Sequence, residues 1–81
     1  MLSADHSNTP EQDTLAHERE KALRWALQSL GGVYREAVIL RDIEGFSYEE
    51  VSETLGISIG TVKSRLARGR DALRKKLEGS L

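Results

Sequence analysis

The sequence predicts an all-α fold. Apolar residues recur at spacings of three and four along much of the 81-residue chain, as expected for helices with one buried side. Helix-start and helix-end signals divide these residues into four segments, and the chain contains one proline and no cysteine. Residues 1–9 are polar and without periodicity, which predicts a disordered tail or linker before one small domain over residues 10–81.

The first helix is expected from Pro10 to about Leu30. Thr9 is a suitable N-cap, and proline is favoured at the first helical position. Gly31-Gly32 should end the helix, because glycine accepts the left-handed conformation that is common just after a helix. Trp25 lies among the apolar positions, so we expect it to pack in the core, with a partner contact as the alternative. The expected apolar face comprises Leu15, Ala22, Leu23, Ala26, Leu27 and Leu30.

Two further helices should follow. The second, over about residues 33–44, is the most apolar segment and should form the centre of the core. The segment Ser47-Tyr48-Glu49-Glu50 is typical of a capping box and predicts a short third helix that ends at Leu55. Gly56 then allows a tight turn, and two helices joined by such a turn form a helix-turn-helix. The expected inward-facing residues are Tyr34, Ala37, Val38, Ile39, Leu40, Ile43, Val51 and Leu55.

The last helix should begin after the N-cap Ser58 and continue through Leu77. Its apolar stripe comprises Ile59, Val62, Leu66, Leu73 and Leu77, with the small Gly69 filling a gap in the series. The opposite side and its two flanks hold Thr61, Ser64, Arg68, Lys63 and Arg65. A helix fits the major groove of duplex DNA, so these polar and basic side chains are positioned to reach base edges.

The charges are distributed unevenly along a chain whose formal net charge is −1. Residues 1–57 hold five basic and eleven acidic residues, whereas residues 58–81 hold seven basic and two acidic residues. The positive end therefore coincides with the predicted groove-facing helix, although a solvated basic helix would have the same composition. For the basic residues farther along this helix, phosphate contact and plain solvation are both open: Arg70, Arg74, Lys75 and Lys76.

Three segments carry a recognisable pattern. They are Tyr34-Arg35-Glu36, Leu40-Arg41-Asp42-Ile43-Glu44-Gly45-Phe46-Ser47-Tyr48-Glu49-Glu50-Val51, and Gly60-Thr61-Val62-Lys63-Ser64-Arg65-Leu66. In this order and at these separations they resemble region 4 of bacterial sigma factors, most closely the extracytoplasmic-function group. The resemblance implies a four-helix domain with a C-terminal helix-turn-helix, winged-helix-like but without a wing. It also implies recognition of the −35 promoter element in transcription initiation, docking on the flap of the RNA polymerase β subunit, and often control by an anti-sigma factor.

The resemblance also implies roles for individual residues. By their positions in the motif, the base-contacting residues would be Lys63, Ser64, Ala67 and Arg68. Ala67 would offer only an apolar contact, for example to a thymine methyl group. The residues near the sugar-phosphate backbone would be Tyr48, Gly60, Thr61, Arg65 and Arg70. Glu49 matches a position close to the backbone as well, but its charge suits capping or the orientation of basic side chains rather than attraction to phosphate.

The chain departs from the family pattern in several places. The family usually has alanine where Gly69 stands, a small apolar residue where Ser52 stands, and a proline near Gly31-Gly32. The family's preceding domain, which melts the promoter, has no match. We therefore expect an excised domain, or a fragment that begins in the inter-domain linker, which should not start transcription alone and should be a monomer or weak dimer.

Two other functions are weighed against promoter binding. The same fold could serve as a protein-interaction module whose groove-facing helix is covered by an anti-sigma factor. It could also be the output domain of a response regulator, but the segment Asp42-Ile43-Glu44-Gly45 favours a sigma factor. His6 and His17 lack partners at metal-ligand spacing, and no nucleophile or phosphate loop is present, so neither a metal, a cofactor nor catalysis is expected. The chain shows no signal peptide or bilayer-spanning run, which fits a cytoplasmic protein without a membrane partner.

Overall fold

Four α-helices and one π-helical segment form the described part of the protein. The computed structural model describes the backbone of residues 10–79 and the side chains of residues 14–79. The α-helices are α1 (Pro10–Gln28), α2 (Gly32–Val38), α3 (Tyr48–Leu55) and α4 (Ile59–Gly79), and the π-helix η2 (Ile39–Ile43) continues α2. No strand occurs within residues 10–79, so the predicted all-α, four-helix fold is confirmed. The expected tail and the expected N-cap Thr9 lie outside the described residues.

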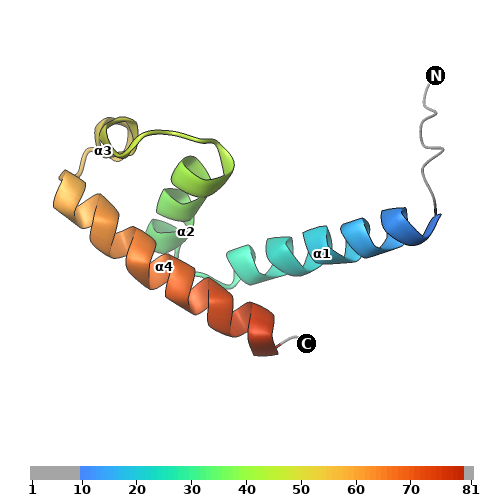
Figure 1. Cartoon of the computed structure of the whole chain (residues 1–81). Helices are drawn as coiled ribbons and strands as arrows, with labels where there is room; N and C mark the ends of the chain where they lie inside the picture. Colours follow the sequence, from blue (N-terminus) through green and yellow to red (C-terminus); the bar gives the residue numbers. More distant parts are fainter. Residues whose placement is uncertain (1–9, 80–81) are drawn as a thin grey trace, which may run out of the picture.

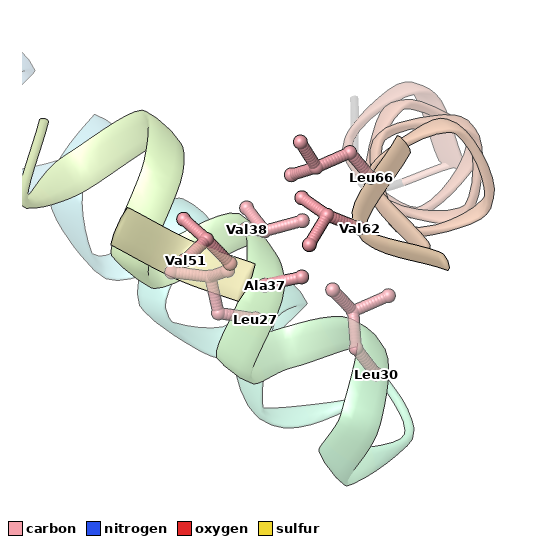
Figure 2. Packing of buried hydrophobic residues seen from close by; sticks show 7 residues of the cluster. All are labelled: Leu27, Leu30, Ala37, Val38, Val51, Val62 and Leu66. Atoms are coloured by element: carbon pink, nitrogen blue, oxygen red, sulfur yellow. The ribbon is translucent and has the colours of Figure 1, made fainter. Parts of the chain in front are cut away.

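The core lies where α2, α3, α4 and the C-terminal end of α1 meet. In Figure 1, α4 crosses beside α2, whereas α1 extends away from the other helices as a long arm. Figure 2 shows Val62 and Leu66 of α4 pointing toward Val38 of α2. The buried cluster consists of Leu27, Leu30, Ala37, Val38, Val51, Val62 and Leu66. Each fully buried valine or leucine side chain contributes about 1.5–3 kcal/mol, so the burial of Val62 and Leu66 fixes the rotation of α4 about its axis.

Gly69 is buried because α4 approaches α2 closely at this position. A Cβ atom on Gly69 would lie 2.7 Å from Val38 Cγ2 and 3.3 Å from the Tyr34 carbonyl oxygen. The neighbouring helix therefore occupies the space that a side chain would need. The gap that Gly69 leaves in the apolar stripe is thus filled by α2 rather than left open.

The turn between α3 and α4 follows the predicted helix-turn-helix. The Ser47 hydroxyl accepts from the Glu50 N–H and the Glu50 carboxylate accepts from the Ser47 N–H, which confirms the capping box. Gly56 ends α3 with φ at +68°, a conformation that side chains disfavour. The Ser52 hydroxyl donates to the Ile57 carbonyl, so the serine that replaces the family's small apolar residue ties the turn to α3.

The end of α1 differs from the prediction. The helix ends at Gln28, and Gly31 is extended, with φ −60° and ψ 147°, so the expected left-handed glycine is absent there. Ser29 and Leu30 donate their N–H groups to carbonyls of the last turn, and Arg35 Nη1 donates to the Gln28 carbonyl at 3.3 Å. Since the last carbonyls already have donors, no left-handed cap is needed.

The burial of α1 was also predicted incorrectly in part. Only Ala26, Leu27 and Leu30 of its apolar face are buried, whereas Leu15 is 54% exposed and Leu23 is 36% exposed. Trp25 is 52% exposed rather than in the core, and Lys76 Nζ lies 5.6 Å from the centre of its ring. The physical reason is visible in Figure 1, where α1 extends away from the other helices and meets them only at its C-terminal end, so only one side of the helix, near that end, can be covered.

The predicted second helix is two segments rather than one. After Val38 the hydrogen bonding shifts to the π pattern, and the Glu44 N–H donates to the Ile39 carbonyl at 2.9 Å. This wider turn leaves Ile43 52% exposed, so its expected place in the core is wrong. Gly45, with φ at +82°, then turns the chain toward α3. Asp42 of η2 pairs with Arg70 of α4, and Arg41 of η2 lies over the ring of Tyr48.

Candidate nucleic-acid interface

The outer side of α4 is the surface that the sequence singles out. Val62 and Leu66 are 0% and 1% exposed, and they fix the inner side of the helix. The four predicted base-contacting residues are all exposed: Lys63, Ser64, Ala67 and Arg68. The predicted orientation of the helix is therefore confirmed, and the side chains of this surface are available to a ligand.

The first turn of α4 is capped by its own hydroxyl groups. Ser58 Oγ accepts from the Thr61 N–H at 3.1 Å and lies 3.0 Å from Thr61 Oγ1. This confirms Ser58 as the N-cap. Ser64 Oγ donates to the Thr61 carbonyl at 3.1 Å, which leaves its lone pairs directed outward as acceptors. These hydrogen bonds satisfy backbone and hydroxyl groups in the first turns of α4 without a ligand.

Positive charge without an acidic partner is concentrated at the start of α4. Lys63, Arg65 and Arg68 form no ion pair with residues 14–79, and Arg65 is the half-buried one of the three. Farther along, Arg74 pairs with Asp71 and Glu78, and Lys75 pairs with Asp71. These pairs hold the pKa of Asp71 below its ordinary value, chiefly through the hydrogen bond from Arg74. Three basic side chains near the predicted groove-facing turns are therefore not neutralised by a carboxylate of the described residues.

The ring of Tyr48 lies close to two basic side chains, one from η2 and one from α4. The guanidinium carbon of Arg41 lies 4.8 Å from the centre of the Tyr48 ring, and Lys63 Nζ lies 5.9 Å from it. Arg41 Nη1 also donates to the Phe46 carbonyl at 2.8 Å, which holds the guanidinium in place. Both separations are within the range of cation–π attraction, so the half-buried ring orients Lys63 and Arg41.

Arg70 is held by Asp42 from η2. Arg70 Nε donates to Asp42 Oδ2 at 2.8 Å, and Arg70 Nη2 donates to Asp42 Oδ1 at 2.6 Å. The hydrogen bond from Arg70 is the main cause that lowers the pKa of Asp42, and the same bond raises the pKa of Arg70, while burial acts in the opposite direction on both groups. Of the predicted backbone-contacting residues, Arg70 is thus the one whose guanidinium already has a carboxylate partner.

The Asp42–Arg70 pair should make stability depend on pH in the acid range. The pKa of Asp42 is lowered in the folded chain, so the pair stabilises the fold above about pH 4 and is lost as pH falls through the lower, folded-state pKa. The pair is partly exposed, which limits its contribution to about 1 kcal/mol or less. Thermal unfolding of the unchanged chain and of Asp42→Asn should show a difference at pH 7 that shrinks below pH 4. A difference that is the same at both pH values would contradict this assignment.

Sequence reasoning missed Arg41 and Asp42 as members of this surface. They lie in η2, and the packing of α2 against α4 is what brings them beside Tyr48 and Arg70. No signal in the residues themselves indicates a contact between positions 28 residues apart. Glu49 is exposed, and the carboxylate of the capping box is that of Glu50.

Neither a metal site nor a membrane-spanning helix is found within residues 10–79. Within this range no three His, Cys, Asp or Glu side chains are grouped so that they could hold a metal ion. None of the helices found there combines the length and the apolar character needed to cross a membrane.

Comparison with known proteins identifies the domain. The family described as Sigma-70, region 4 matches residues 20–73, which is more than half of the chain. The chain belongs to this family. The match covers all of α2, α3 and most of α4, so the surface described above lies within this region 4 domain.

The relatives of this region 4 domain are RNA polymerase sigma factors, several of them described as ECF sigma factors. It is 44% identical to the ECF RNA polymerase sigma factor SigE of Mycolicibacterium smegmatis, over 94% of the chain and 32% of that protein. It is 40% identical to the RNA polymerase sigma factor SigZ of Bacillus subtilis, over 90% of the chain and 42% of that protein. The chain thus spans less than half the length of these relatives.

A solved structure agrees with the fold. The sigma factor RpoE of Bartonella quintana, in complex with the anti-sigma factor NepR, matches with a TM-score of 0.68 and 35% identity. The match covers 96% of this chain and 43% of that one. The family and the fold that the resemblance implied are therefore confirmed.

Proposed function

We propose that this region 4 domain binds the −35 element of promoter DNA in transcription initiation by RNA polymerase. The observation that supports this most is the outward orientation of Lys63, Ser64 and Arg68 on a helix whose opposite side is buried. A helix presented in this way fits the major groove, and its exposed residues can read base edges. This is a binding function without catalysis, and it would place the chain in the cytoplasm.

The proposed contacts fall into two groups. Lys63, Ser64, Ala67 and Arg68 would contact bases, with Arg68 suited to a bidentate contact with guanine. Tyr48, Gly60, Thr61, Arg65 and Arg70 would contact the sugar-phosphate backbone. Contacts of the second group position the helix and carry no sequence information. The start of α4 supplies most members of both groups, which agrees with the concentration of unpaired positive charge there.

Selection from a random pool of duplexes would test the proposal. We expect the purified chain to recover a single consensus that resembles a −35 element, with weak binding because one small module makes few contacts. Affinity should fall as salt rises, since each phosphate contact releases counterions. Recovery of no consensus at low salt, from a chain shown by circular dichroism to be folded, would overturn the proposal.

A second function rests on protein binding. The solved neighbour is a sigma factor in complex with an anti-sigma factor, and α1 exposes Leu15, Leu23 and Trp25. An anti-sigma factor is therefore a proposed partner, as is the β-subunit flap of RNA polymerase. Competition would separate the possibilities: exclusion of promoter DNA by the anti-sigma factor indicates one shared surface, whereas protein binding without any DNA shift favours the second function alone.

A further inference from the structure

The pair formed by Asp42 and Arg70 has the geometry of a phosphate contact. Two parallel N–H groups of Arg70, Nε and Nη2, donate to the two oxygens of one carboxylate at 2.8 Å and 2.6 Å. The same planar fork binds phosphate oxygens in this bidentate way. Asp42 thus occupies the position that a phosphate would take if Arg70 contacted a nucleic-acid backbone.

The surroundings of the pair are basic. Arg41 and Lys63 both lie over the ring of Tyr48, and Tyr48 also interacts with Arg70. Within residues 14–79, Asp42 is the only acidic side chain that pairs with any of these three cations. One carboxylate therefore stands among positive groups that would otherwise be open to an anion.

The pair is accessible enough to exchange partners. The side chain of Arg70 is 46% exposed and that of Asp42 is 35% exposed. Exposed ion pairs are weak because water and salt screen them. A dense array of phosphates can therefore compete with Asp42 for the guanidinium, at a cost that lowers the observed affinity.

We propose that Asp42 is an affinity-determining residue, an internal carboxylate that competes with DNA phosphate for Arg70. In the free domain Asp42 holds Arg70, and in the complex Asp42 and a phosphate compete for it, so that Arg70 contacts phosphate in only part of the complexes. The inference rests on the proposed DNA-binding function and assigns a new role to a residue outside α4. Because phosphate contacts carry no sequence information, Asp42 restrains binding to promoter and random duplexes to the same degree.

Asp42→Asn tests the inference, with Glu44→Gln as the matched control. Glu44 is exposed and lies two positions away, has no ion pair within the described residues, and loses the same charge when changed to Gln. We expect Asp42→Asn to bind both duplexes up to about fivefold more tightly at low salt. The slope of log affinity against log salt should steepen by up to about 0.9, the value for one further phosphate contact in every complex. Glu44→Gln should leave this slope as it is in the unchanged chain.

Arg70→Ala and Asp42→Asn, made singly and together, form a double-mutant cycle. Arg70→Ala should weaken binding more when combined with Asp42→Asn than in the otherwise unchanged chain, because only then is Arg70 wholly available to phosphate. Equal effects in both backgrounds would overturn the inference. Circular dichroism checks the fold of each variant, and Asp42→Ser repeats the test with a second side chain.

The outcomes separate the inference from the function on which it rests. If the unchanged chain binds DNA but Asp42→Asn and Glu44→Gln behave alike, the inference fails alone. Weaker binding by Asp42→Asn would also overturn it, because the pair would then support α4 rather than compete with phosphate. If neither the unchanged chain nor any variant binds a duplex, the proposed function fails and the inference fails with it.

Discussion

Replacing Arg68 by alanine is expected to weaken binding to the selected promoter duplex by about 1–3 kcal/mol, which corresponds to roughly fivefold to 150-fold in affinity. The side chain of Arg68 is exposed on the outer side of α4 and forms no hydrogen bond or ion pair with the described residues. Its guanidinium is therefore available for two hydrogen bonds to the edge of a guanine. The loss should be greatest on the preferred sequence, because a base contact contributes little to binding of random DNA.

Two control variants distinguish base recognition from charge. Arg68→Lys keeps the charge but loses the planar fork, so it should keep the salt dependence and lose discrimination at one base position. Lys75→Ala removes a charge farther along α4, where Lys75 already pairs with Asp71 at 3.2 Å. It should reduce affinity slightly and equally for all sequences. Binding is measured by fluorescence anisotropy with duplexes that differ at single base pairs.

Two results would contradict the assignment of a base contact to Arg68. If Arg68→Ala binds with unchanged affinity and unchanged sequence preference, Arg68 contacts no base. If Arg68→Ala and Lys75→Ala lose affinity equally on promoter and random duplexes, Arg68 acts only through its charge. Either result would move base recognition to Lys63 and Ser64, the remaining polar members of the group.

Most of the helix-turn-helix could be predicted because its signals are local. The capping box at Ser47, the turn at Gly56 and the cap at Ser58 each depend on a few consecutive residues. The inward placement of Val62 and Leu66 follows from the helical period. These same features orient the outer side of α4, so the surface proposed for DNA binding was also predictable.

The errors arose where an outcome depends on distant parts of the chain. Periodicity predicts an apolar side for α1 but not how far the other helices extend to cover it, so Leu15 and Trp25 were expected to be buried. The π-helical turn that exposes Ile43 and the contact of Asp42 with Arg70 depend on how α2 packs against α4. No residue pattern in one segment encodes such a contact.

Gly69 offers the largest expected effect on stability. Gly69→Val is expected to lower the free energy of unfolding by about 3 kcal/mol, because it places a branched side chain where a Cβ alone would lie 2.7 Å from Val38 Cγ2. Val38 is 2% exposed and branched at Cβ, so it has little freedom to rotate away. The Tyr34 carbonyl, 3.3 Å from the same point, belongs to the backbone and moves only with α2.

Gly69→Ala should change the free energy of unfolding through two effects of opposite sign. Alanine favours a helix interior by about 1 kcal/mol over glycine. Overpacking a well-filled core costs about 1–3 kcal/mol, and the buried position of Val38 makes the upper part of that range applicable. We therefore expect a net loss, although alanine is the usual residue of the family at this position. Gly60→Ala is the matched control on the same helix, since its nearest neighbour to an added Cβ is Ser58 Oγ at 3.9 Å.

Chemical unfolding of the variants tests the close contact between α2 and α4. Gly60→Ala should be neutral or slightly stabilising, whereas Gly69→Ala should destabilise. Val38→Ala should remove the atom that obstructs the new side chain, so Gly69→Ala should cost less in that background than in the unchanged chain. If Gly69→Ala is as stable as Gly60→Ala, or if Gly69→Ala costs as much stability in the Val38→Ala background as in the unchanged chain, α2 and α4 lie farther apart than described. Gly69 would then be an ordinary helix position, and the rotation of α4 would depend on Val62 and Leu66 alone.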